Sequence, residues 1–169
     1  MTRKKNWFMV LVLIMVLGIL ISENAAAQNN DRLNGTWISN YKELEMEMIL
    51  NNGYYERSSI IDRGEFQTFE KGNYSINNGM ISFKPTHCMQ VGSFVSKTGL
   101  ISGKLYAIDE YIISLKKSYK TLGMSEEMIN ENIKLIISQP PFDYSLISNS
   151  LILTLTYNGK SETMVYTKK

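Results

Sequence analysis

The adjacent residues His87 and Cys88 are of the types that most often do nucleophilic or metal chemistry. A cysteine nucleophile needs a neighbouring base, and a protein-bound metal ion needs three or four ligands. The chain has one His and one Cys, and neighbouring residues of a strand point to opposite faces of its sheet. We therefore expect a buried cysteine beside a surface histidine, with catalysis or metal binding as the alternative.

A row of carboxylates, Glu43, Glu45 and Glu47, is the other candidate for chemistry. A calcium site needs oxygens that converge from several directions, whereas residues two apart on a strand are separated by about 7 Å. We expect a solvated strand face here, with a cation site as the alternative. The sequence has no Gly-x-Ser-x-Gly, phosphate-binding glycine loop or Cys-x-x-Cys. We therefore expect no enzyme, no metal site and no cofactor.

Methionine and aromatic residues point to binding instead. The chain has 10 Met, 10 Tyr and 6 Phe. Methionine adapts to irregular partners, and tyrosine brings a polar group to an apolar wall. Seven side chains are expected to face inward and to line a cavity for a small apolar ligand: Met46, Met48, Tyr74, Phe83, Leu153, Leu155 and Tyr157. The alternative is that they fill a solid interior.

These residues lie on segments in which apolar and polar side chains alternate, which is the period of half-buried strands. Pairs of the Asn-Gly type, which supply the positive φ angles of hairpin turns, separate the segments. The turns are expected at Asn51-Asn52-Gly53, Arg63-Gly64, Asn77-Asn78-Gly79 and Asn158-Gly159. Short antiparallel strands must bury one face and hide their edges. The sequence thus predicts a mainly β fold, an antiparallel up-and-down barrel of about 8–10 strands.

One segment has helical spacing. Ser125 can cap it, acidic residues occupy its first turn, and Pro140-Pro141 ends it. Its apolar stripe comprises Ile129, Ile133, Ile136 and Ile137. We predict one helix over about 125–138, placed before the last two strands. Upstream, 99–107 and 111–115 are expected to be two strands around a turn at Asp109-Glu110.

Residues 1–27 have the pattern of a secretory signal peptide: a basic start, an apolar run over 7–21 and small residues at Ala25–Ala27. The run is shorter than the ~20 residues that span a bilayer, so we expect cleavage after Ala27 rather than a membrane anchor. The leader holds three of the 18 basic and one of the 16 acidic residues. The remaining charges balance, so no basic field attracts nucleic acid. We expect one periplasmic or secreted domain, 28–169.

The segment Leu33-Asn34-Gly35-Thr36-Trp37 resembles the Gly-x-Trp opening of lipocalins and related calycin barrels. Later segments, in order, also resemble bacterial lipocalin-like domains: Leu50-Asn51-Asn52-Gly53-Tyr54, Lys71-Gly72-Asn73-Tyr74-Ser75-Ile76, Gly79-Met80-Ile81-Ser82-Phe83 and the ending Leu153-Thr154-Leu155 to Tyr166-Thr167-Lys168. The resemblance implies structural roles for Gly35, Trp37 and Lys168. In that family the tryptophan packs across the closed end of the barrel, and a basic residue of the last strand covers it.

The resemblance and the residues together predict a function. We expect an exported lipocalin-like protein that binds a small, largely apolar molecule in its barrel without changing it chemically. The alternative is an envelope protein–protein interaction module with a solid, packed barrel and no ligand. An internal void above ~300 Å³ would favour the ligand, and a filled interior would favour the protein partner.

Overall fold

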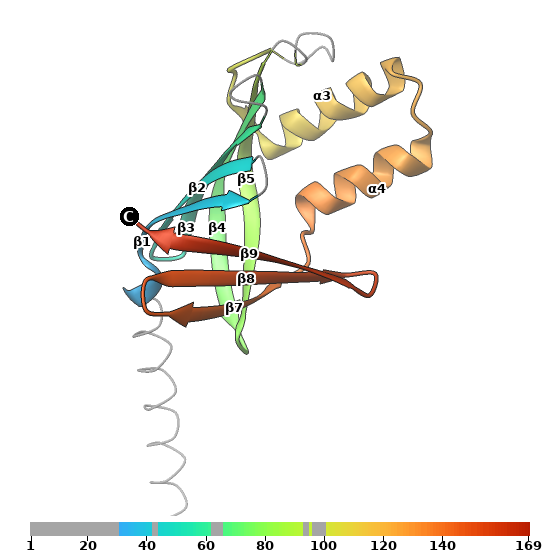
Figure 1. The fold of residues 1–169 in the computed structure, drawn as a ribbon. Helices are drawn as coiled ribbons and strands as arrows, with labels where there is room; N and C mark the ends of the chain where they lie inside the picture. Colours follow the sequence, from blue (N-terminus) through green and yellow to red (C-terminus); the bar gives the residue numbers. More distant parts are fainter. Residues whose placement is uncertain (1–30, 42–43, 62–65, 93–94, 96–100) are drawn as a thin grey trace, which may run out of the picture. The chain divides into compact units, whose positions relative to one another are not determined.

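The computed structural model describes residues 31–41, 44–61, 66–92, 95 and 101–169 (Figure 1). Residues up to Asn34 form a unit of their own, and the description below concerns the second unit, Gly35–Lys169. The signal peptide expected at 1–27 lies outside the described residues and stays a prediction. Among the described residues, no helix is long and apolar enough to cross a bilayer.

The described part of this unit contains nine strands and two helices. In chain order they are β1 (Gly35–Tyr41), β2 (Leu44–Asn51), β3 (Tyr54–Ile61), β4 (Phe66–Asn77), β5 (Met80–Gly92), β6 (Tyr106–Ala107), α3 (Ile108–Thr121), α4 (Glu126–Ile137), β7 (Phe142–Ile147), β8 (Ser150–Tyr157) and β9 (Lys160–Lys168). All strands except β6 form an antiparallel ring in the order β1-β2-β3-β4-β5-β7-β8-β9, which closes where β9 pairs with β1. The predicted mainly β, up-and-down barrel is therefore confirmed.

The hairpins form at the predicted Asn-Gly pairs. Asn52, Asn78 and Asn158 have φ angles of 48°, 50° and 50°, and the glycine after each also has a positive φ. Two successive residues with positive φ define the turn whose twist matches antiparallel strands. These turns join β2 to β3, β4 to β5 and β8 to β9. The turn expected at Arg63-Gly64 lies outside the described residues.

The region around the helices requires three corrections, the first at the strand expected over 99–107, of whose described residues 101–107 only Tyr106–Ala107 forms a strand, β6. The helix predicted at 125–138 is present as α4, and the Ser125 hydroxyl accepts a hydrogen bond from Met128 N at 3.3 Å. However, 111–115 is not a strand, because it lies within a second helix, α3. Asp109-Glu110 occupies the first turn of that helix, where the dipole favours carboxylates. Three strands, not two, follow α4 because 142–147 forms β7.

Alternation along the strands produces the barrel core. The large, fully buried side chains of the barrel include Trp37, Met48, Leu50, Tyr55, Ile81, Leu151, Leu153 and Tyr166. The Tyr166 hydroxyl lies 3.5 Å from the Met46 sulfur, so side chains of β9 and β2, the two neighbours of β1, meet in the interior. A second cluster joins α3 and α4 to β5: Tyr111, Leu115, Ile129 and Ile133 pack with Cys88. The helix pair thus buries its apolar stripes against the far part of β5.

A β-bulge sets the register of the longest hairpin. The pairing of β4 with β5 shifts between Lys71 and Gly72. A Cβ atom at Gly72 would overlap the carbonyl oxygen of Lys84 and would lie 2.8 Å from Pro85 Cα. Only glycine admits this close approach of two backbones. The bulge keeps Glu70 and Tyr74 on one face of β4 while their partners on β5, Cys88 and Phe83, also share a face.

Candidate binding sites of the barrel

The strand register places one continuous row of side chains on the inner face. Trp37 is paired with Met48, Met48 with Arg57, Arg57 with Glu70, and Glu70 with Cys88. Directly paired residues of neighbouring strands lie on the same face of the sheet and contact each other. The middle of an otherwise apolar row therefore carries two opposite charges.

These charges form an ion pair that is largely shielded from solvent. Arg57 Nη2 lies 2.6 Å from Glu70 Oε1, and their side chains are 15% and 20% exposed. The Tyr55 hydroxyl donates to the same carboxylate oxygen at 3.1 Å, and Arg57 Nη2 donates to Gln139 Oε1 at 3.4 Å. Each charge thus has a partner inside the protein, and the pair contributes no net charge to the interior.

Aromatic rings surround Phe83. Its ring centroid lies 4.9 Å from that of Tyr55, 6.4 Å from that of Tyr74 and 5.8 Å from that of Phe142. The Arg57 guanidinium carbon lies 5.6 Å from the Phe83 centroid. At this level the aromatic rings pack against one another. Burial also raises the pKa of the Tyr55 hydroxyl above its usual range, so the hydroxyl remains a hydrogen-bond donor to Glu70.

One buried polar group in this cluster has no partner. The Tyr74 hydroxyl oxygen is the sole buried side-chain nitrogen or oxygen atom without a hydrogen bond in the described part of the chain. The residue is only 6% exposed. Leaving a buried hydroxyl unsatisfied costs about 1–3 kcal/mol. This position therefore favours binding of a molecule that can supply the missing hydrogen bond.

The seven residues predicted to line a cavity do not all lie inside. Met46, Met48, Tyr74, Phe83 and Leu153 are buried in the barrel, Leu155 is half-buried, and Tyr157 is 49% exposed. Tyr157 pairs with Lys160 at the β8–β9 turn, where the strands extend past the core. Tyr157 therefore shares the strand face of Leu153 but lies beyond the buried part of the barrel. Ligand binding by the others stays a prediction.

The three residues assigned structural roles lie together. Trp37 is 1% exposed, it pairs with Lys168 across β1 and β9, and the Lys168 ammonium nitrogen lies 5.2 Å from the indole centroid. Gly35 has a φ of 138°, and a Cβ there would lie 2.6 Å from Lys168 Cε. The Lys168 ammonium thus covers the indole at a distance that allows a cation–π interaction. The lysine side chain passes close to Gly35, where any larger residue would clash with it.

The residues first considered for chemistry are separated. Cys88 pairs with Glu70 on the inner face, whereas His87 pairs with Lys71 on the outer face. Burial, with the nearby Glu70 carboxylate, raises the pKa of the Cys88 thiol to about 12, so it stays protonated. Glu45 and Glu47 lie on the outer face of β2, and Glu43 lies outside the described residues. Within the described ranges, no three His, Cys, Asp or Glu side chains gather at a metal-sized site.

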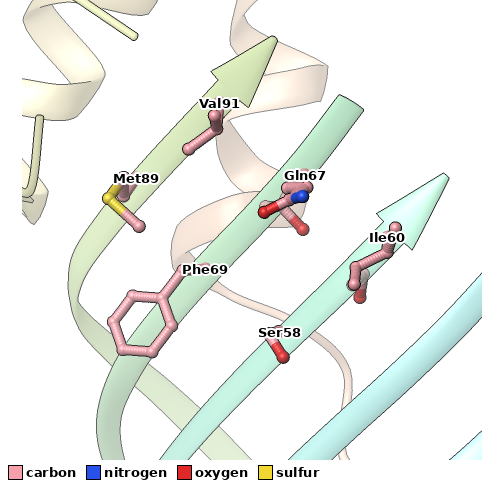
Figure 2. Close-up of a pocket in the computed structure, with 8 residues that line it drawn as sticks. Ser58, Ile60, Gln67, Phe69, Met89 and Val91 are labelled. Atoms are coloured by element: carbon pink, nitrogen blue, oxygen red, sulfur yellow. The ribbon is translucent and has the colours of Figure 1, made fainter. Parts of the chain in front are cut away.

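A pocket on the outer face of β3, β4 and β5 is the feature that sequence reasoning missed. It has a volume of about 200 Å³, and Figure 2 shows side chains of the three strands pointing to its side of the sheet. The pocket is lined by Ser58, Ser59, Ile60, Gln67, Thr68, Phe69, Met89 and Val91. Other parts of the outer face mix polar and apolar residues: on β8 and β9, Thr154 hydrogen-bonds with Thr163 and Thr156 with Ser161, while Ile152 pairs with the exposed Val165. On β3–β5 the apolar side chains line a pocket.

The fold and these two sites define the class of the protein as a closed eight-stranded antiparallel barrel with an associated helix pair. Comparison of the chain with protein-family models, with curated proteins and with solved structures found no match.

Proposed function

We propose that this chain is an exported, lipocalin-like, non-catalytic binding protein that holds a small, largely apolar molecule inside its barrel. The observation that carries the proposal is the Tyr74 hydroxyl, which is buried without a hydrogen-bond partner in an aromatic wall. Closure of the ring supports it, because a barrel of eight strands is wide enough to hold one small ligand.

The binding energy would come from the apolar wall. Burial of ligand surface contributes about 25 cal/mol per Å². Met46 and Met48 are unbranched and adapt to different shapes. Because the rings around Phe83 already contact each other, the ligand must be small, and the flexible methionines must adjust to admit it.

Native mass spectrometry of the protein purified from its own cells tests this function. We expect a co-purifying molecule that is released on unfolding and that protects the barrel against urea. Protein that carries no molecule, and whose stability no apolar compound increases, would contradict the proposal. Such a result would instead favour the solid barrel with a protein partner.

Export is a separate part of the proposal and has its own test. If residues 1–27 are removed as expected, the mature chain begins at Gln28. N-terminal sequencing of the protein from its own cells should therefore start at or within a few residues of Gln28. An intact Met1 on protein retained in the cytoplasm would contradict export and leave the binding function standing.

A protein partner on the outer face is the second candidate function. The observation in its favour is the apolar pocket around Phe69 and Met89, since exposed apolar patches often mark interaction sites (Figure 2). A photo-reactive benzophenone residue at Ser58 should then cross-link to one discrete protein in cells. The same residue at Thr156, on the polar outer face of β8, is the control. Equal labelling from both positions would contradict a specific partner.

A further inference from the structure

We infer that the ligand of the barrel is an uncharged molecule with one polar group, an alcohol, phenol or ketone, that hydrogen-bonds with the Tyr74 hydroxyl. This inference rests on the proposed ligand-binding function and deepens it by naming the chemical class. Two observations carry it: the interior charges already neutralise each other, and one buried hydroxyl lacks a partner.

The ion pair disfavours a charged ligand. An anion would have to displace Glu70 from Arg57, and the displaced carboxylate would then be buried without a counter-charge. The other hydrogen bonds of the pair, from Tyr55 to Glu70 and from Arg57 to Gln139, would be strained or lost as well. A cation would meet the same difficulty at Arg57. A neutral molecule leaves all of these contacts intact.

The position of Tyr74 favours a single polar group on the ligand. Tyr74 and Arg57 both lie next to Phe83, so the tyrosine and the ion pair belong to the same side-chain cluster. A tyrosine hydroxyl donates one hydrogen bond and accepts others. The Tyr74 ring lies beside that of Phe83, and no described residue hydrogen-bonds with the Tyr74 hydroxyl. An apolar molecule with one hydroxyl or carbonyl oxygen therefore matches this wall.

Three probes of similar size test the class directly: 2-phenylethanol, ethylbenzene and phenylacetate. Their dissociation constants for the purified protein would be measured by NMR titration at neutral pH. We expect 2-phenylethanol to bind roughly 2- to 10-fold more tightly than ethylbenzene, the effect of one neutral hydrogen bond. Phenylacetate should bind most weakly, because its charge has no free partner inside.

Two variants assign the effect to the named residues. Tyr74→Phe should abolish the advantage of 2-phenylethanol over ethylbenzene. Tyr54→Phe is the matched control, because the Tyr54 hydroxyl is on the exposed side and hydrogen-bonds with Glu56. Glu70→Gln removes the counter-charge of Arg57 and should raise the affinity for phenylacetate by about tenfold or more, as expected for a charged hydrogen bond. If Glu70→Gln does not fold, Tyr74→Phe carries the test.

The outcomes separate the inference from the proposed function. Wild-type protein that binds phenylacetate as tightly as 2-phenylethanol would overturn the neutral class, although ligand binding would stand. Unchanged affinities in Tyr74→Phe would also overturn it and would assign the hydroxyl to a bound water. If none of the three probes binds, the inference is overturned, whereas the proposed function fails only if the protein also carries no co-purifying molecule.

Discussion

The inner and outer faces of β3, β4 and β5 each carry an exception to the usual distribution of polarity. The inner face carries the Arg57–Glu70 ion pair in the middle of a buried row. The outer face of the same strands carries Phe69 and Met89 at the apolar pocket shown in Figure 2. Strands of a soluble barrel ordinarily place apolar residues inside and polar residues outside.

The two exceptions call for different explanations. The ion pair costs desolvation, so its presence inside is not explained by stability alone. The apolar residues of the outer pocket are only half-buried, so packing of the barrel core does not explain why they are apolar. In contrast, β8 and β9 have buried Leu151 and Leu153 inside, and outside they have paired hydroxyls beside the Ile152–Val165 pair. The unusual composition of β3–β5 is therefore where binding functions are to be sought.

The largest expected effect on stability comes from truncating a phenylalanine of the inner face, and a phenylalanine of the outer face serves as the comparison. Phe83→Ala removes a ring that is 4% exposed and contacts three other rings. We expect a loss of about 3–5 kcal/mol in the free energy of unfolding, measured in urea. Phe69→Ala on the outer face should cost about 1 kcal/mol or less, because its ring is only half-buried. Equal losses would contradict the assignment of the two faces.

Part of this difference between faces can be predicted from the sequence. On β2 and β8, alternation identifies the buried residues Met46, Met48, Leu151 and Leu153, although Ile49 and Ile152 place apolar side chains at outward positions. The Asn-Gly turns and α4 are also specified locally, by backbone conformation, a capping serine and prolines. These features depend on neighbours within a few residues, so a sequence pattern is enough to identify them.

The ion pair and the outer pocket depend on distant residues. The sequence of β3 has polar or aromatic side chains at successive positions, so its period does not identify the inner face. Pairing of Arg57 with Glu70 follows from hairpin geometry, and pairing of Glu70 with Cys88 also requires the bulge beside Gly72. Helix α3 was missed because its buried residues Tyr111, Leu115 and Ser118 also include a polar one.

The ion pair provides the next test. Glu70→Ala leaves Arg57 without its counter-charge in a shielded site and should destabilise the fold by about 3 kcal/mol. The double variant Arg57→Met, Glu70→Leu removes both charges and fills the space with apolar atoms. It should recover most of that loss in urea titrations. A double variant less stable than Glu70→Ala would show that the pair is needed for folding rather than retained for binding.

Alkaline pH should lower the free energy of unfolding, because several buried groups hold their protons more tightly in the folded state. An unfolded thiol titrates near its ordinary pKa of 9.0, whereas burial raises the pKa of folded Cys88 to about 12. The folded state then holds its proton longer, so this contribution to stability is complete below pH 9 and is lost as the pH rises toward 12. The buried Tyr55 and Tyr111 hydroxyls, whose pKa values burial also raises, act in the same direction.

Urea titrations at about pH 8 and about pH 10.5 measure this loss. The midpoint should fall at the higher pH, and Cys88→Ala should reduce the fall without removing it, because the tyrosines remain. At about pH 8 the native thiol should also resist iodoacetamide and react only after unfolding. Rapid alkylation of the native protein would show that Cys88 is accessible and that its surroundings are not as buried as described.

The smallest expected change in stability is at the outer pocket. The same variant, tested with an apolar dye, shows which face of the sheet offers an accessible apolar site. Ile60→Thr keeps a β-branched residue on β3 while making the pocket more polar, so the free energy of unfolding should change by about 0.5 kcal/mol or less. Fluorescence of the apolar dye anilinonaphthalene sulfonate should nevertheless decrease, because the dye loses part of its binding surface. Val165→Thr, exposed on β9 away from the pocket, should leave the dye signal unchanged. Dye fluorescence that changes in Tyr74→Phe but not in Ile60→Thr would place the accessible apolar site inside the barrel. Such a result would contradict the proposal that the outer pocket binds a protein partner.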